Sequence, residues 1–155
     1  MSRFTFSAQP NSHNSTDVGD YPERLKQFDQ WVVTSQKKPL HPSSGWHKGS
    51  NQLAFEDAYQ KAIEVGGGIA FCFMQGSPFI GFDLDDVVTH GRFTQEALDI
   101  VSRLRSYTEV SSSGTGLHII AEGRFDDERK HRGPLTDAGH IEVYDSGRYF
   151  VLTGA

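Results

Sequence analysis

The feature that most constrains the fold is a succession of short apolar runs separated by turns. The runs are rich in valine, isoleucine and aromatic residues, which fit the pleated surface of a strand, and glycine, proline and serine lie between them. In chain order they read WVVT, IAFCFM, FIGFDLDD, YTEV, LHIIA, IEVY and YFVLT. Because helical segments interrupt this series at only a few points, we predict an α/β (α+β) fold with an antiparallel or mixed sheet and helices on one face.

Apolar residues at helical spacing predict helices within residues 21–30, 54–68 and 94–106. The second helix is expected to end at its glycines and to bury Ala54, Ala58, Ala62 and Val65. The third is expected to bury Ala97, Leu98, Val101 and Leu104.

The connections complete this outline. Residues 35–52 carry prolines, glycines and lysines, so we expect a loop there. The segment QGSP between IAFCFM and FIGFDLDD suits a turn, which predicts a β-hairpin formed by these two runs. Residues 122–140 form a polar excursion before the last two strands.

Composition sets limits on the class of protein. The 155 residues, 36% of them hydrophobic, predict one domain over residues 21–155 after a disordered polar tail over residues 1–20. The net charge of −5 argues against a generic basic nucleic-acid binder, so local patches must carry any such binding. The single cysteine, Cys72, lies in an apolar run and favours a reducing, cytoplasmic setting. Neither a signal peptide nor an apolar run of bilayer length is present, which predicts no membrane partner.

Three acidic residues alternate out of apolar strands. In GFDLDD, strand alternation puts Asp83 and Asp85 on one face, about 6.5–7 Å apart. An isolated pair of this kind is more often an ordinary solvent-facing strand end, but Glu142 in IEVY has the same setting. Three such carboxylates suit an oxygen-ligand site for Mg²⁺ or Mn²⁺. Asp86 has the opposite strand parity and Asp145 opens a turn, so both are weaker alternatives.

The segment SSSGTG lies between two β-branched runs and lacks large side chains. Its backbone N–H groups and hydroxyls could cradle a triphosphate, and His118 in the following strand could donate to a phosphate oxygen. The candidate phosphate contacts in the loop are Ser111, Ser113, Gly114, Thr115 and Gly116. A flexible hairpin loop followed by a half-buried histidine explains this stretch equally well.

Several basic residues are candidates for phosphate or nucleic-acid contact. Arg148 could offer a bidentate guanidinium to a phosphate, or be a solvated turn residue. Lys37 and Lys38 in the first loop could contact phosphate or template. Lys130 and Arg132, in the segment ERKHRG, could meet a nucleic-acid backbone, although such a run is most often a solvated loop.

Five segments, in order, resemble the catalytic domain of archaeo-eukaryotic-type primase-polymerases, especially the compact versions in phage and plasmid replication proteins. They are KKPLHPSSGW, GGGIAFCFM, FIGFDLDDV, SYTEVSSSGTGLHI and IEVYDSGRYFVLTG, and the resemblance covers about residues 31–154. The family's acid-x-acid motif is matched by Asp83 and Asp85. Its Ser-x-His-like nucleotide element is matched by SGTGLH with His118, and its third acid by Glu142.

The resemblance implies an RRM-like catalytic sheet over residues 69–155, fused to an N-terminal α/β module over residues 21–68. It implies template-directed nucleotidyl transfer from an NTP or dNTP to a 3′-hydroxyl, in the replication of a mobile genetic element. Asp83, Asp85 and Glu142 would hold two Mg²⁺ or Mn²⁺ ions. The other partners would be a single-stranded DNA template, a primer and a helicase domain or protein. Relatives generally continue into further helices, so both a fragment of a larger replicase and a stand-alone protein remain open.

Two other functions compete with this one. The first is a catalytically weak nucleotide- or DNA-binding module that acts through a partner, which the acidic net charge favours. The second is a metal-dependent phosphoesterase that uses the same acids, against which a loop suited to a triphosphate argues. Dependence of incorporation on Asp83 separates a polymerase from the first, and release of pyrophosphate separates it from the second.

Overall fold

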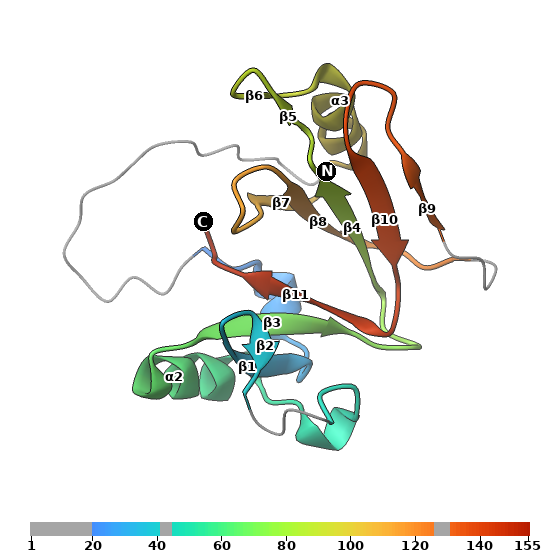
Figure 1. Cartoon of the computed structure of the whole chain (residues 1–155). Coiled ribbons are helices and arrows are strands. Elements are labelled where there is room, and N and C mark those ends of the chain that lie inside the picture. The colour runs from blue at the N-terminus through green and yellow to red at the C-terminus, as the bar shows by residue number, and fades with distance from the viewer. Residues whose placement is uncertain (1–19, 41–44, 126–130) are drawn as a thin grey trace.

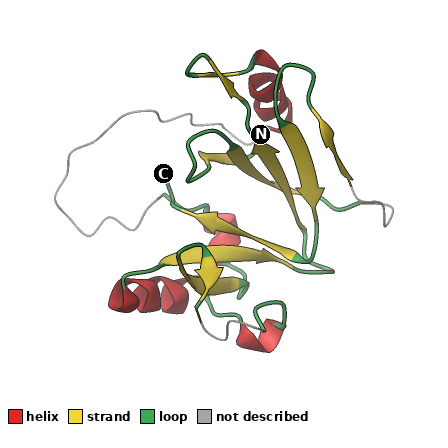
Figure 2. Ribbon diagram, viewed as in Figure 1, coloured by secondary structure: helices red, strands yellow, loops and turns green. Residues whose placement is uncertain are grey.

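Two antiparallel sheets make up most of the computed structural model, which describes residues 20–40, 45–125 and 131–155 (Figures 1 and 2). The first sheet has the strand order β11-β3-β1-β2. Its strands are β1 (Trp31–Ser35), β2 (Lys38–Pro39), β3 (Gly68–Phe73) and β11 (Arg148–Leu152). All neighbouring pairs are antiparallel, as predicted from the sequence.

The second sheet has the order β7-β8-β4-β10-β9 and is also antiparallel throughout. Its strands are β4 (Phe79–Asp85), β7 (Tyr107–Val110), β8 (Leu117–Glu122), β9 (His131–Pro134) and β10 (His140–Tyr144). A small ribbon of β5 (Val88–Thr89) and β6 (Arg92–Phe93) leads from β4 into the third helix.

The three predicted helices are present as α1 (Glu23–Lys26), α2 (Phe55–Val65) and α3 (Gln95–Leu104), together with a 3-10 turn, η1 (Gly49–Asn51). α2 ends at Gly66, whose φ of 64° lies in the left-handed region that glycine adopts without strain. α3 begins where the Thr94 hydroxyl accepts a hydrogen bond from the Ala97 N–H. Figure 1 shows α2 alongside the first sheet and α3 alongside the second.

Two side chains predicted to lie in the core are exposed instead. Val65 is 42% exposed because it sits in the last turn of α2, at the edge of the buried face. Leu98 is 36% exposed. It lies about 90° around α3 from the buried face, since each residue advances a helix by about 100°.

The predicted hairpin between residues 69–74 and 79–86 is wrong. β3 pairs with β1 and β11 in the first sheet, whereas β4 pairs with β8 and β10 in the second. β3 is buried along almost its whole length, so it needs a neighbouring strand on each edge and cover on both faces. The turn segment QGSP therefore passes the chain from one sheet to the other instead of folding it back.

Two short strands occur where loops were expected. β2 follows a tight turn in which Gln36 and Lys37 both have positive φ, 48° and 66°, without the glycine or asparagine that marks such a turn in a sequence. β9 lies within the polar stretch 122–140 and pairs with β10, although its residues HRGP are poor strand formers.

The mixed α+β class and the antiparallel pairing are therefore confirmed. The RRM-like core and the division at residues 68 and 69 stay predictions, and the expected tail over residues 1–20 lies outside the described residues except for its last. In the described part of the chain, no helix has the length and apolar character needed to cross a bilayer.

Candidate functional site

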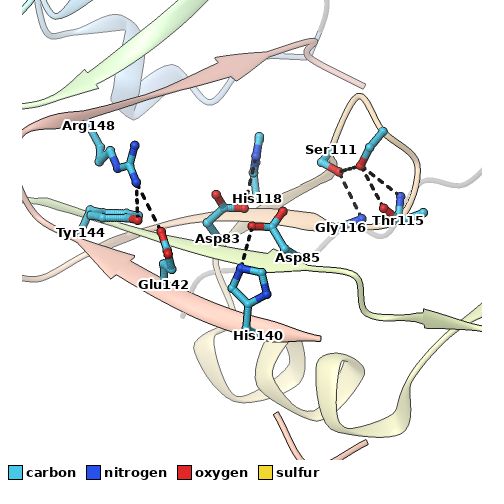
Figure 3. A network of polar contacts seen from close by, with 11 residues as sticks. Asp83, Asp85, Ser111, Thr115, Gly116, His118, His140, Glu142, Tyr144 and Arg148 are labelled. Atoms are coloured by element: carbon cyan, nitrogen blue, oxygen red, sulfur yellow. Dashed lines mark hydrogen bonds and ion pairs between the residues drawn. The ribbon is translucent and has the colours of Figure 1, made fainter. Parts of the chain in front are cut away.

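Strand register brings four of the predicted site residues into one row across the second sheet. Asp83 on β4 lies opposite His118 on β8 and opposite Glu142 on β10. The row continues outward to Glu109 on β7 and Arg132 on β9. Directly opposed residues of a sheet point to the same face, so these five side chains share one face of the sheet. Figure 3 shows Asp83, His118 and Glu142 on this face.

The packing of the opposite face fixes this orientation. Leu84, Leu117 and Ile119 are fully or almost fully buried and pack against Ala97 and Val101 of α3. Because side chains alternate along a strand, burial of Leu84 under the helix turns Asp83 and Asp85 to the other face. The alternation predicted from GFDLDD is therefore present.

Asp83 carries the clearest electrostatic signature of the three acids. Its Oδ1 lies 3.5 Å from His118 Nε2 without the geometry of a hydrogen bond, and it has no hydrogen-bond donor among the described residues. Burial, followed by the charges of Asp85 and Glu142, raises the pKa of Asp83 from 3.8 to about 6. A buried carboxylate oxygen that has no donor and lies near two further negative charges is a favourable position for a bound cation.

The other two acids are paired with basic side chains. Asp85 Oδ2 lies 3.3 Å from His140 Nε2, and both side chains are roughly half exposed. Glu142 is only 16% exposed and lies between two arginines, with Oε1 3.6 Å from Arg132 Nη1 and Oε2 3.4 Å from Arg148 Nη2. Arg148 also donates to the Tyr144 hydroxyl at 2.8 Å and lies over the Tyr144 ring.

The donor set fits a hard divalent cation in its chemistry. Mg²⁺ and Mn²⁺ prefer carboxylate oxygens, and Asp83, Asp85 and Glu142 present them on one face. In the described residues no three acidic, histidine or cysteine side chains converge tightly enough to hold one ion as they stand. Binding would therefore require Glu142 or Asp85 to exchange its basic partner for the ion.

The serine–glycine loop between β7 and β8 is held by its own hydrogen bonds. The Ser111 N–H donates to the Gly116 carbonyl at 2.9 Å, and the Gly116 N–H donates to the Ser111 hydroxyl at 3.1 Å. The hydroxyl oxygens of Ser111 and Ser113 lie 2.8 Å apart, and those of Ser113 and Thr115 lie 3.1 Å apart. Gly114 has a φ of 78° and its N–H donates to the Ser111 carbonyl. Four of the five predicted loop residues, Ser111, Gly114, Thr115 and Gly116, thus use their N–H groups within the loop, and the exposed hydroxyls are the groups it offers to a ligand.

A side chain at Gly116 would not fit beside the end of β4. A Cβ there would lie 2.5 Å from the Leu84 carbonyl oxygen and 2.9 Å from the Ser111 hydroxyl. The loop is also tied to the residues after β4, since the Val87 N–H donates to the Thr115 carbonyl at 2.9 Å. The loop and the acidic strand are therefore fixed relative to each other.

His118 connects this sheet to the first one. Its ring stacks on Phe150 of β11, with centroids 4.6 Å apart and an angle of 14° between the planes. Burial lowers the pKa of His118, the charge of Lys37 lowers it further, and Glu109 and Asp85 oppose the change. The hydroxyl of Tyr149, the neighbour of Phe150 on β11, donates to the Lys37 carbonyl at 3.2 Å, which holds the β1–β2 turn against this strand.

The remaining basic candidates have different positions in the structure. Lys38 is exposed on β2, Arg132 contacts Glu142, and Lys130 lies outside the described residues.

Sequence reasoning missed Glu109. It is 3% exposed, and its carboxylate accepts hydrogen bonds from the Tyr107 hydroxyl at 2.7 Å and from the N–H groups of Thr153 and Gly154. Its place beside His118 follows from the pairing of β7 with β8, so register is the signal that could have found it.

Comparison with known proteins supplies a relative. The chain is 33% identical over 141 residues to the DNA Primase-polymerase of Nitratiruptor phage NrS-1. The aligned region covers 84% of this chain and 20% of the phage protein, so the chain spans about a fifth of the relative's length. No protein-family model matches the chain. The predicted resemblance to primase-polymerases is confirmed by this relative.

Proposed function

Since the chain is homologous to a phage DNA primase-polymerase, we propose that it is a primase-polymerase catalytic domain that transfers nucleotides to a 3′-hydroxyl on a DNA template. One observation carries the proposal: the strand register that sets Asp83, His118 and Glu142 side by side on one face. The reaction joins the 3′-oxygen to the α-phosphorus of an NTP or dNTP. The bond to the β-phosphate breaks, the hydroxyl proton is lost, and pyrophosphate leaves.

Asp83, Asp85 and Glu142 are the residues that would hold two Mg²⁺ or Mn²⁺ ions. Such ions, when bound, make a hydroxyl more acidic and stabilise negative charge on phosphate oxygens. The raised pKa of Asp83 and its Oδ1 without a donor support this role. Arg132 and Arg148 pair with the Glu142 carboxylate and would hold it in place until a cation binds.

The triphosphate would lie between the serine–glycine loop and Arg148. His118 presents an imidazole beside Asp83, and stacking on Phe150 limits its rotation. Arg148, only 3.4 Å from Glu142, could turn from that carboxylate to a phosphate oxygen once the carboxylate binds a cation. The hydroxyls of Ser111, Ser113 and Thr115, with Lys37, complete the set of phosphate donors.

We further propose that this activity serves the replication of a mobile genetic element and that a helicase domain or protein acts with it. The phage origin of the relative supports the first part.

The test is incorporation of labelled nucleotides on a single-stranded DNA template, with and without a primer, in Mg²⁺ and in Mn²⁺. Wild type is expected to extend the primer, and Asp83→Ala and Glu142→Ala to abolish extension while keeping the fold by circular dichroism. Asp29→Ala, an exposed acid in the turn before β1, is the matched control. Product without primer identifies priming. Undiminished incorporation by Asp83→Ala would contradict the assignment, and metal-dependent nucleotide binding without extension would favour a binding module that acts through a partner.

A further inference from the structure

A pair of aromatic side chains lies on the face of the first sheet that points away from the acids. Along β11, Arg148 and Phe150 point toward the second sheet, so Tyr149 between them points to the opposite face. Trp46 packs edge-on against Tyr149, with ring centroids 5.0 Å apart. Both rings are only partly buried, because they cover the small buried group of Val32, Ala70 and Cys72 and keep the rest of their surface toward solvent.

Exposed lysines lie in the two segments that carry or contact these rings. The Tyr149 hydroxyl donates to the Lys37 carbonyl at 3.2 Å, which fastens the β1–β2 turn, and Lys38 with it, to β11. The Lys48 N–H donates to the Gly45 carbonyl at 3.0 Å, which closes the turn that contains Trp46. Within the described residues, no ion pair or hydrogen bond engages the ammonium groups of Lys37, Lys38 or Lys48.

We propose that this aromatic–basic surface, made of Trp46, Tyr149, Lys37 and Lys48, binds single-stranded nucleic acid and guides the template strand to the site. The inference rests on the proposed function. Proteins hold single strands by stacking bases on aromatic side chains while lysines and arginines follow the phosphates. In a chain of net charge −5, unpaired lysines beside two partly exposed rings form a local surface suited to a polyanion.

Continuity with the site sets the path of the strand. Tyr149 is the neighbour of Arg148, which contacts Glu142, and the charge of Lys37 acts on His118. Because β11 is an edge strand of the first sheet, a single strand that passes around this edge from Tyr149 to Arg148 reaches the row of acids.

The two tryptophans provide a direct readout. Trp31 is completely buried, whereas Trp46 belongs to the proposed surface. An oligothymidylate is expected to quench the fluorescence of the wild-type protein, and Trp46→Phe is expected to remove the quenching. Tyr149→Ala should weaken oligonucleotide affinity roughly five- to a hundredfold, since stacking contributes about 1–3 kcal/mol per base. Lys48→Ala should lower the slope of log affinity against log salt by about 0.7.

Controls separate this inference from the proposed function. Lys61→Ala on α2, which removes an exposed lysine paired with Glu64, should leave oligonucleotide binding unchanged. Nucleotide triphosphate binding, measured by itself, should be the same in wild type and in Lys48→Ala. Oligonucleotide affinity that survives in folded Tyr149→Ala and Lys48→Ala, together with quenching that survives in Trp46→Phe, would overturn the surface, even if incorporation proceeds. Loss of incorporation in every protein, with binding still dependent on Trp46, would leave the surface standing and overturn the polymerase.

Discussion

The substitution Asp83→Asn is expected to make the metal-free protein more stable while removing its activity. Asp83 is about a quarter exposed, its Oδ1 has no donor among the described residues, and Asp85 and Glu142 add repulsion. Its pKa rises from 3.8 to about 6 on folding. At about 1.4 kcal/mol for each pKa unit, the charged carboxylate costs the folded state about 3 kcal/mol at neutral pH.

The sign of the pH dependence follows from the same values. Between pH 3.8 and about 6 the folded protein binds the Asp83 proton more tightly than the unfolded chain does. The Asp83 contribution to stability therefore falls as pH rises through this window, and it is constant above it. Asparagine has no proton to lose, so the variant and wild type should differ little near pH 4 and by about 3 kcal/mol at pH 7.

Urea denaturation in EDTA at pH 4 and at pH 7 measures the difference. Asp29→Asn, which changes an exposed carboxylate, should follow wild type at both pH values. A variant that is equally stable or less stable than wild type at pH 7 would refute the argument that Asp83 is held in an unfavourable environment for the sake of its function.

Substitutions at Gly116 and at Glu109 give two further predictions. Gly116→Ala should destabilise the protein by about 1–3 kcal/mol and raise the KM for nucleotide, because its Cβ would displace the Leu84 carbonyl or Ser111; an unchanged KM would show that the loop does not contact substrate. Glu109→Ala should cost about 2–4 kcal/mol in urea denaturation, because it leaves the N–H groups of Thr153 and Gly154 without their acceptor. A loss below about 1 kcal/mol would mean that water replaces the carboxylate.

Local sequence patterns predicted the helices and strands better than they predicted which strands pair with each other. The helices and most strands follow from apolar spacing and turn residues, and the shared face of Asp83 and Asp85 follows from alternation alone. Pairing depends on contacts far apart in the chain, which a short motif does not encode. The segment QGSP is compatible with a hairpin, but the burial of β3 on both faces decides against it.

The same distinction between local pattern and distant contact explains which site residues could be predicted. Asp83, His118 and Glu142 could be named because each alternates out of an apolar strand. Glu109 could not, because its role depends on the N–H groups of residues 153 and 154, more than forty positions later. The partners of Glu142 were equally hidden, since Arg132 belongs to a strand that its own residues HRGP do not favour.

The acidic net charge and a polyanionic substrate are compatible because charge is arranged locally. The row of acids on β4 and β10 is bordered by Arg132, Arg148, His118 and His140, and Lys37 acts on it from the first sheet. Under the proposed function, each arginine that now pairs with Glu142 would become available to a phosphate when a divalent ion binds that carboxylate. Since the field of nearby groups outweighs distant surface charge over a Debye length of about 8 Å, a net charge of −5 does not bar a triphosphate from this face. Removing Arg148 should therefore weaken nucleotide binding far more than removing an exposed lysine of α2 such as Lys61.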